Sequence, residues 1–215
     1  MAAAFSMLQT TSYRDISIRQ LAQLAGVNSA MISYHFGGKE GLIIAALKAQ
    51  LDEAIPTVSA PASGQPLVSM LGEFIGQLIK LYARQPWIPR MIVDEVASKE
   101  GRMRDLYIEQ IVRDKNNMMV AMLKALQQAG ELRADLDPQL MQVSMISLVA
   151  FPFIAAPLLQ QAFGFSLSEG NTERWIEHLT RLVLEGAANP GSAPQGEQNL
   201  NPLNEHTAPS TGESP

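Results

Sequence analysis

The sequence predicts an all-α protein, with an N-terminal three-helix unit that contains a helix-turn-helix and a larger helical region behind it. Apolar residues recur at three- and four-residue spacing along most of the chain, and glycine, proline and capping residues divide it into segments of helical length. No stretch shows the alternation of a half-buried β-strand. With 215 residues, 47% of them hydrophobic, the chain can bury a substantial core in one or two domains.

The first predicted helices are short. Residues 2–8 can form an amphipathic helix. Ser17 and Gln20 have the spacing of a capping box, which predicts the next helix over residues 18–25, and Gly26 then ends it.

A second short helix is predicted to follow at once, so the chain makes a tight helical corner. Either Asn28 or Ser29 can cap this helix, and Gly37 and Gly38 end it after His35. The two helices share one small core, and its predicted inward residues are Ile18, Leu21, Ala22, Ala25, Val27, Ile32 and Phe36.

Small and hydroxyl-bearing side chains face outward from this second helix. Ser29, Ala30, Met31 and Ser33 stand where a solvated helix normally carries Lys or Glu. Such a face suits a helix that lies close against base edges in the major groove. The alternative is a plain helical corner, which the coincidence of corner, caps and a third capped helix disfavours. We therefore expect a DNA-reading element here.

Longer helices are predicted for the rest of the chain. A fourth helix begins at Lys39, and residues 57–66 have the composition of a linker. Further helices are expected over residues 67–84, 88–98, 102–129, 138–163 and 168–187. Gly72 and Gly76 allow the first of these to cross another helix closely. We divide the chain into a helix-turn-helix domain (1–50), a larger helical domain (51–188) and a disordered tail (189–215). The effector-binding and dimerisation roles expected of the second domain rest on residues that are described below.

Charge is divided unevenly along the chain. Residues 1–50 carry a net charge of +2, whereas the remainder carries 12 basic and 19 acidic residues, a net charge of −7. DNA affinity must therefore be concentrated on one small surface, with help from symmetry-related copies. The absence of cysteine excludes disulfides and thiolate metal sites and fits a cytoplasmic protein. The first residues lack the features of a signal peptide.

The N-terminal residues resemble the TetR family of one-component transcriptional repressors. The likeness rests on Ile-Arg-Gln-Leu-Ala (18–22), Ala-Gly-Val-Asn (25–28) and Tyr-His-Phe-Gly-Gly-Lys-Glu-Gly-Leu (34–42), and it is specific over residues 12–50. Beyond them it extends only to the all-helical architecture and the length. It implies a homodimer that binds a near-palindromic double-stranded DNA operator and responds to a small-molecule effector.

The resemblance assigns roles to individual DNA-facing positions. Arg19 matches an arginine that reads a guanine in some members, although an ordinary surface role is the alternative. Lys39 matches a phosphate-binding lysine. Ser33 stands where many members have a phosphate-binding tyrosine, so that contact is shortened here or moved to Tyr34 or His35. The complete predicted DNA-binding set is Ser17, Arg19, Asn28, Ser29, Ala30, Met31, Ser33, Tyr34, His35 and Lys39.

The front end departs from the family pattern, because no basic arm precedes the first helix. We hypothesise that the chain begins at an internal start codon or is truncated. In-frame coding sequence upstream would support this hypothesis, and a stop codon immediately before Met1 would exclude it. If the start is authentic, DNA affinity should be lower and less dependent on salt, since fewer phosphates are neutralised.

Methionine and aromatic residues recur on the predicted helices of the second domain. The chain has 11 methionines, and thioether side chains repack easily, which suits a pocket for varied apolar molecules. The candidate effector-binding residues are Phe74, Tyr82, Met91, Tyr107, Met118 and Met122. The alternative is that these residues simply form the core, as helical apolar stripes usually do.

Residues 138–168 contain no charged side chain, which invites interpretation as a membrane span. Pro152 and Pro157 interrupt the segment and the usual interfacial anchors are missing, so burial by its own domain and by a second subunit is favoured. The last predicted helix offers a matching stripe for half of a four-helix dimer interface. The predicted dimer contacts are Met145, Leu148, Phe151, Trp175, Leu179 and Leu182.

Together these patterns favour a ligand-responsive homodimeric repressor, released from its operator when a small apolar molecule stabilises a dimer with wrongly spaced DNA-reading units. An enzyme is disfavoured, because the three histidines accompany no nucleophile motif, phosphate loop or metal-ligand spacing. We expect no cofactor. The main alternative is a helical ligand-binding or scaffold protein whose DNA-reading unit no longer functions.

Overall fold

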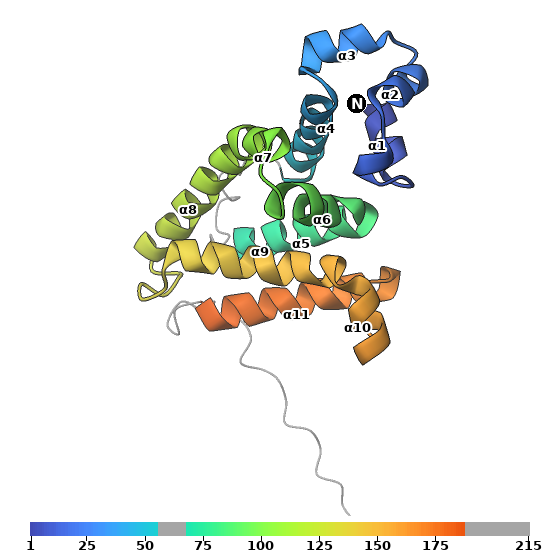
Figure 1. The fold of residues 1–215 in the computed structure, drawn as a ribbon. Helices are drawn as coiled ribbons and strands as arrows, with labels where there is room; N and C mark the ends of the chain where they lie inside the picture. The colour runs from blue at the N-terminus through green and yellow to red at the C-terminus, as the bar shows by residue number, and fades with distance from the viewer. Residues whose placement is uncertain (56–67, 188–215) are drawn as a thin grey trace, which may run out of the picture.

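The computed structural model describes residues 1–55 and 68–187, and every regular element within them is a helix (Figure 1). The all-α prediction is therefore confirmed. The N-terminal group of helices consists of α1 (Ala2–Leu8), the 3₁₀ turn η1 (Tyr13–Asp15), α2 (Ile18–Ala25), α3 (Ser29–Phe36) and α4 (Lys39–Ala54).

The C-terminal group follows residues 56–67, which contain the predicted linker and lie outside the described residues, as does the predicted tail. It consists of α5 (Ser69–Arg84), α6 (Trp87–Met91), the π-helical turn η2 (Ile92–Ala97), α7 (Arg102–Tyr107), the π-helical turn η3 (Ile108–Val112), α8 (Arg113–Gln128), α9 (Pro138–Ile154), α10 (Ala156–Phe163) and α11 (Glu169–Ala187). Helix α6 runs directly into η2, and α7 continues through η3 into α8.

Helix α4 connects the two groups. Ile43, Ile44 and Leu47 are completely buried, and the helix packs against α1 and α3 on one side and against α5 and α7 on the other. Helix α4 is therefore shared by the two groups and lies between the C-terminal helices and α3 (Figure 1).

The segment predicted as one helix over residues 138–163 is two helices, bent by 75° at Ala155. This prediction was wrong because a proline inside a continuous helix leaves the carbonyl four residues earlier without its N–H donor, whereas Pro157 is tolerated in the first turn of a new helix. Pro157 lies four residues after Phe153, whose carbonyl instead accepts a bond of 3.4 Å from Nε of Arg90. Among the described residues no single helix is long and apolar enough to span a membrane, and only the bent pair α9–α10 has the combined length.

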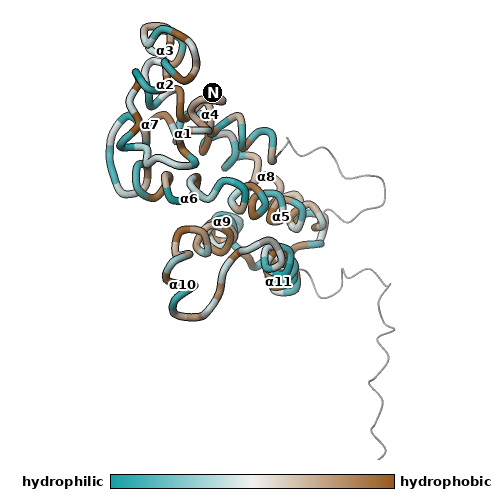
Figure 2. Tube along the Cα trace, turned by 90° about the vertical axis from the view of Figure 1, so that its right-hand side faces the viewer, coloured by the Kyte–Doolittle hydropathy of each residue, from teal (hydrophilic) through white to brown (hydrophobic). Residues whose placement is uncertain are grey.

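The predicted close crossing of α5 is confirmed. A methyl group on Gly72 would lie 2.9 Å from Cγ2 of Thr180, and one on Gly76 would lie 3.4 Å from Cγ2 of Ile176. The missing side chains on α5 thus let α11 approach closely and bury its apolar face. In the view of Figure 2, α11 is coloured largely as hydrophilic, in keeping with the charged residues on its other side.

Candidate nucleic-acid interface

The corner between α2 and α3 is built by local hydrogen bonds that the sequence predicts. The hydroxyl oxygen of Ser17 accepts a bond of 3.2 Å from the backbone N–H of Gln20, whose side chain returns to the Ser17 N–H at 2.8 Å. Gly26 ends α2 with φ of +66°, in the left-handed region that glycine tolerates. Asn28, rather than Ser29, caps α3, and its Oδ1 accepts from the N–H of Ala30 at 2.9 Å.

Helix α3 is held by the buried side chain of Ile32 and by Phe36, which is half-buried against the core, and it presents most of its remaining surface outward. Met31 is 49% exposed and Tyr34 is 85% exposed. Ala30, Ser33 and His35 are exposed too, whereas Ser29 is half-buried. Two inward predictions need correction: Ala25 and Val27 are exposed, because Gly26 turns the chain away from the core at this corner.

Arg19 lies on the exposed surface of α2. No hydrogen bond or ion pair to another described residue holds its guanidinium, so the group is available to a ligand outside the chain. In B-DNA the N7 and O6 acceptors of guanine match the two parallel donors of such a group.

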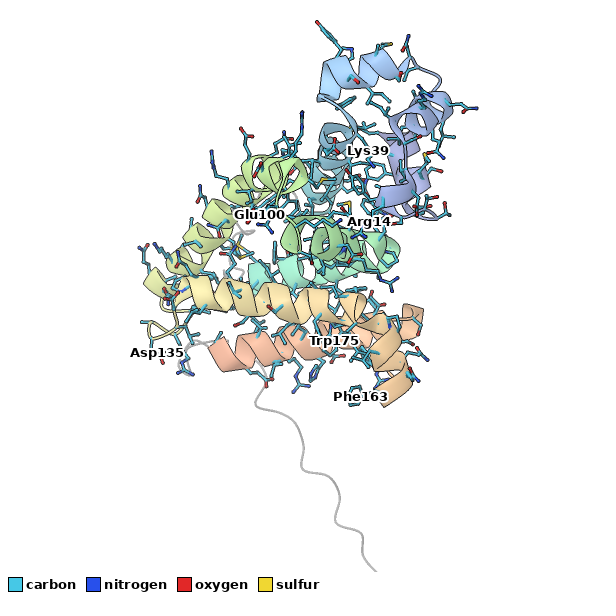
Figure 3. All side chains as sticks on the ribbon, in the orientation of Figure 1. Arg14, Lys39, Glu100, Asp135, Phe163 and Trp175 are labelled. Atoms are coloured by element: carbon cyan, nitrogen blue, oxygen red, sulfur yellow. The ribbon has the colours of Figure 1, made fainter. Side chains whose placement is uncertain are left out.

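Lys39 has a structural role in addition to any contact with DNA. Its Nζ donates to the backbone carbonyls of Tyr13, at 3.1 Å, and Ile16, at 2.8 Å, and lies 4.0 Å from the centre of the Tyr13 ring. The start of α4 is thereby tied to the segment that precedes α2 (Figure 3). Nearby, the Tyr13 hydroxyl donates to Glu40 at 3.1 Å, and burial followed by the charge of Glu40 raises the pKa of this phenol.

A buried carboxylate joins the two groups of helices. Glu95 of η2 accepts a bond of 2.8 Å from Nε of Arg14 and one of 2.6 Å from Nζ of Lys99. Burial on its own would raise the pKa of Glu95, but the hydrogen bonds from Lys99 and Arg14 outweigh it and keep the pKa below its ordinary value. The carboxylate is therefore charged at neutral pH and holds η1 against η2.

Comparison with known proteins identifies this arrangement. Residues 1–46 match the family model described as bacterial regulatory proteins of the tetR family, and residues 68–183 match the model of the tetracyclin repressor-like C-terminal domain. The chain belongs to the TetR family of transcriptional regulators. As a member of this family it is a DNA-binding protein that regulates transcription.

More distant likenesses agree with the TetR fold. The transcriptional regulator RutR of Escherichia coli K12 is 22% identical over 190 residues, which cover 86% of this chain and 87% of RutR. FadR of Bacillus subtilis, solved in complex with stearoyl-CoA, superposes with a TM-score of 0.67 at 17% identity and covers 86% of this chain and 96% of its own. The ketosteroid regulator KstR2 of Mycobacterium tuberculosis superposes with a TM-score of 0.59 at 20% identity. The match covers 87% of this chain and 92% of KstR2.

The six predicted effector residues lie among the C-terminal helices of this TetR-family chain, and two of them line separate cavities. Met91 lines a cavity of about 520 Å³ between the segment 9–13 and α6, and Met118 lines another of about 450 Å³ beside α4. Phe74 and Met122 are half-buried against the core.

The two tyrosines among the six are neighbours. Tyr82 is buried with its ring 5.7 Å from that of Phe153, and burial together with nearby Tyr107 raises its pKa. Burial raises the pKa of Tyr107 to about 12. Both hydroxyls are therefore protonated at neutral pH, and neither donates a hydrogen bond to another described residue.

The predicted dimer contacts divide into two sets. Leu148, Phe151 and Leu182 are exposed, and Trp175 is half-buried. Met145 and Leu179, at 2% and 0% exposed, lie instead in the core of the monomer, which corrects the prediction for these two residues. Helical spacing identifies an apolar stripe but does not say whether α5 or a second subunit covers it.

The exposed apolar residues of α9 continue into a groove at its junction with α10 and α11. The groove has a volume of about 610 Å³ and is lined by Ser147, Leu148, Phe151, Pro152, Leu159, Phe163, Phe165 and Trp175. Figure 3 shows Trp175 on α11 and Phe163 at the far end of α10. Apart from Ser147, every side chain that lines this groove is apolar.

Two important positions escaped the sequence analysis. The sequence assigns Glu95 no structural role, because nothing local reveals that Arg14, 81 residues earlier, is its partner. Gly41 was not predicted to be important either. A glycine in the first turn of a helix that follows a tight corner nevertheless indicates that the backbone of the preceding helix approaches closely. A Cβ on Gly41 would lie 1.7 Å from the carbonyl oxygen of Phe36.

Proposed function

We propose that this TetR-family regulator is a homodimeric repressor of the cytoplasm that binds a near-palindromic operator and is released from it by a small apolar molecule. We call α3 the recognition helix. The observation that carries the proposal is the composition of its outer face. This face exposes small, apolar and hydroxyl side chains to solvent, while Ile32 and the half-buried Phe36 anchor the opposite side of the helix.

Such a face suits the major groove for a physical reason. Alanine and serine allow the backbone of the recognition helix to approach base edges closely, hydroxyls either donate or accept hydrogen bonds, and Met31 offers an apolar contact to a thymine methyl group. Tyr34 and His35 remain proposed phosphate contacts at the exposed end of the same helix.

Arg19 is the proposed base-reading cation. Arg19→Ala should weaken binding to the preferred operator by about 1–3 kcal/mol and leave binding to random duplex nearly unchanged, because a bidentate contact to guanine is lost and phosphate contacts remain. Titration of both duplexes by fluorescence anisotropy measures the difference. Equal losses on the two duplexes would show that Arg19 contacts only the backbone.

The effector is proposed to bind among the C-terminal helices near Tyr82 and Tyr107. Stearoyl-CoA and a ketosteroid are the first probes, since FadR was solved with the former and KstR2 is described as a ketosteroid regulator. A ligand that releases the operator must itself bind more weakly to the operator complex, by the same factor. Calorimetry with and without operator measures this factor, and equal affinities would contradict the release mechanism.

Tyr107→Phe provides a more local test of the effector site. It removes one hydroxyl without changing the shape of the ring, and it should weaken effector binding about two- to tenfold while leaving operator binding intact. Tyr34→Phe, which makes the same chemical change on the exposed face of α3, is the control. Unchanged effector affinity in Tyr107→Phe would place the site elsewhere.

Selection of bound fragments from random duplex DNA is the experiment that tests the proposal as a whole. A repressor dimer should enrich a sequence with two related half-sites about one helical turn apart, because each recognition helix reads one of them. If no fragment is enriched at low salt, the alternative of a ligand-binding protein with an inactive DNA-reading unit is supported instead.

A further inference from the structure

The N-terminal group has few basic side chains available for DNA phosphates. Its basic residues within the first 50 are Arg14, Arg19, Lys39 and Lys48. Arg14 pairs with Glu95, Lys39 donates to two backbone carbonyls, and Lys48 pairs with a carboxylate one turn further along α4. Arg19 alone of these four has no partner among the described residues. Phosphate neutralisation therefore calls for cations from outside this segment.

Arg102, the first residue of α7, extends to the end of the recognition helix. A methyl group built on Gly37, which terminates that helix, would lie 2.5 Å from Nη2 of Arg102. Gly37 has φ of +71° and no side chain, so the guanidinium can lie directly against the turn between α3 and α4. Arg102 thus belongs to the C-terminal group in sequence and to the DNA-facing end in space.

The guanidinium of Arg102 is exposed and unpaired within residues 1–55 and 68–187. Its basic neighbours are engaged: Arg104 donates to the carbonyls of Val96 and Ala97, and Lys99 pairs with Glu95. An exposed cation without a carboxylate, held beside the recognition helix, has the chemistry that binds a phosphate.

We propose that Arg102 binds a phosphate of the operator backbone beside the end of the recognition helix, and so adds a DNA contact from the C-terminal group. This inference rests on the operator binding proposed above. The contact carries no sequence information, because a phosphate is the same at every base pair. It also makes phosphate binding depend on the position of α7, which packs against α4.

The test is Arg102→Gln, with Arg102→Lys and Arg113→Gln as matched variants. Arg113 is also exposed, and it lies about three turns further along the same helical run. Arg102→Gln should weaken binding to the selected operator and to random duplex alike, by roughly three- to tenfold per subunit. It should also make the slope of log K against log salt concentration, which we call the salt slope, shallower by about 1 per subunit. Arg102→Lys should restore most of the affinity, and Arg113→Gln should match the wild type.

Thermal denaturation of each variant separates a phosphate contact from packing on the turn. Unchanged stability together with a reduced salt slope supports the proposal. The proposal is overturned if Arg102→Gln binds DNA with the affinity and salt slope of the wild type. It is also overturned if the variant loses affinity together with stability and Arg102→Lys does not restore binding. If the wild-type protein binds no duplex at all, the proposed function fails, and this inference fails with it.

Discussion

Replacing Gly41 with alanine should destabilise the DNA-binding end of the molecule and abolish operator binding. The added methyl group would lie 1.7 Å from the oxygen and 2.9 Å from the carbon of the Phe36 carbonyl. Both atoms belong to backbone, so no side chain can rotate away, and α4 must move from the end of α3. We expect the free energy of unfolding to fall by about 3 kcal/mol, at the upper end of overpacking effects. Chemical denaturation and an operator titration measure the two losses.

Gly186→Ala is the matched control for this prediction. It makes the same substitution in α11, where the new methyl group would meet no described atom within 4 Å beyond the adjoining residues and backbone of its own helix. Because alanine favours a helix more than glycine does, this variant should be as stable as the wild type or up to about 1 kcal/mol more stable. Wild-type stability and DNA affinity in Gly41→Ala would show that α3 and α4 do not meet so closely.

Replacing Phe151 with glutamate should convert the proposed dimer into monomers. Phe151 is 55% exposed in an apolar groove of α9, α10 and α11, and twofold symmetry would bury the new charge twice in one interface. The dimer dissociation constant should rise at least about 100-fold, as for the loss of a central aromatic anchor. Operator affinity should fall with it, since a monomer reads only one half-site. Sedimentation equilibrium gives the oligomeric state.

Ile108→Glu serves as the control for the dimer variant. Ile108 is another exposed apolar residue, but it lies in η3 and away from the groove. The Ile108→Glu variant should keep both the oligomeric state and the operator affinity of the wild type. Dimers of wild-type strength in Phe151→Glu would exclude this face as the subunit interface, whereas circular dichroism would reveal a variant that had simply unfolded.

Much of the DNA-binding end could be predicted because its structure is made by residues close together in sequence. The capping box of Ser17, the left-handed turn at Gly26 and the Asn28 cap act over two or three positions, so residue type and spacing suffice. The outward face of the recognition helix follows from the same periodicity. Its contacts with DNA, and the division of the chain into domains, remain predictions.

Helix length and the identity of buried partners were harder to predict. The break at Ala155 depends on Pro157 and on Arg90. Pro157 cannot donate to the carbonyl of Phe153, and Arg90, on another helix, donates to it instead. Likewise, the stripe of α11 contains Leu179, buried in the monomer, and Leu182, exposed, within one turn. Helical periodicity gives the direction in which a side chain points from the helix axis, but it does not give the element that packs against that side chain.

The helical class, the corner that exposes α3 and the resemblance to the TetR family could all be inferred from the amino-acid sequence, because those features are encoded in local spacing. Three contacts became visible only in the folded molecule: Glu95 binds Arg14, Lys39 donates to backbone carbonyls, and Arg102 reaches Gly37. These contacts join residues 23 to 81 positions apart, and such pairings arise only when packed helices bring distant segments together.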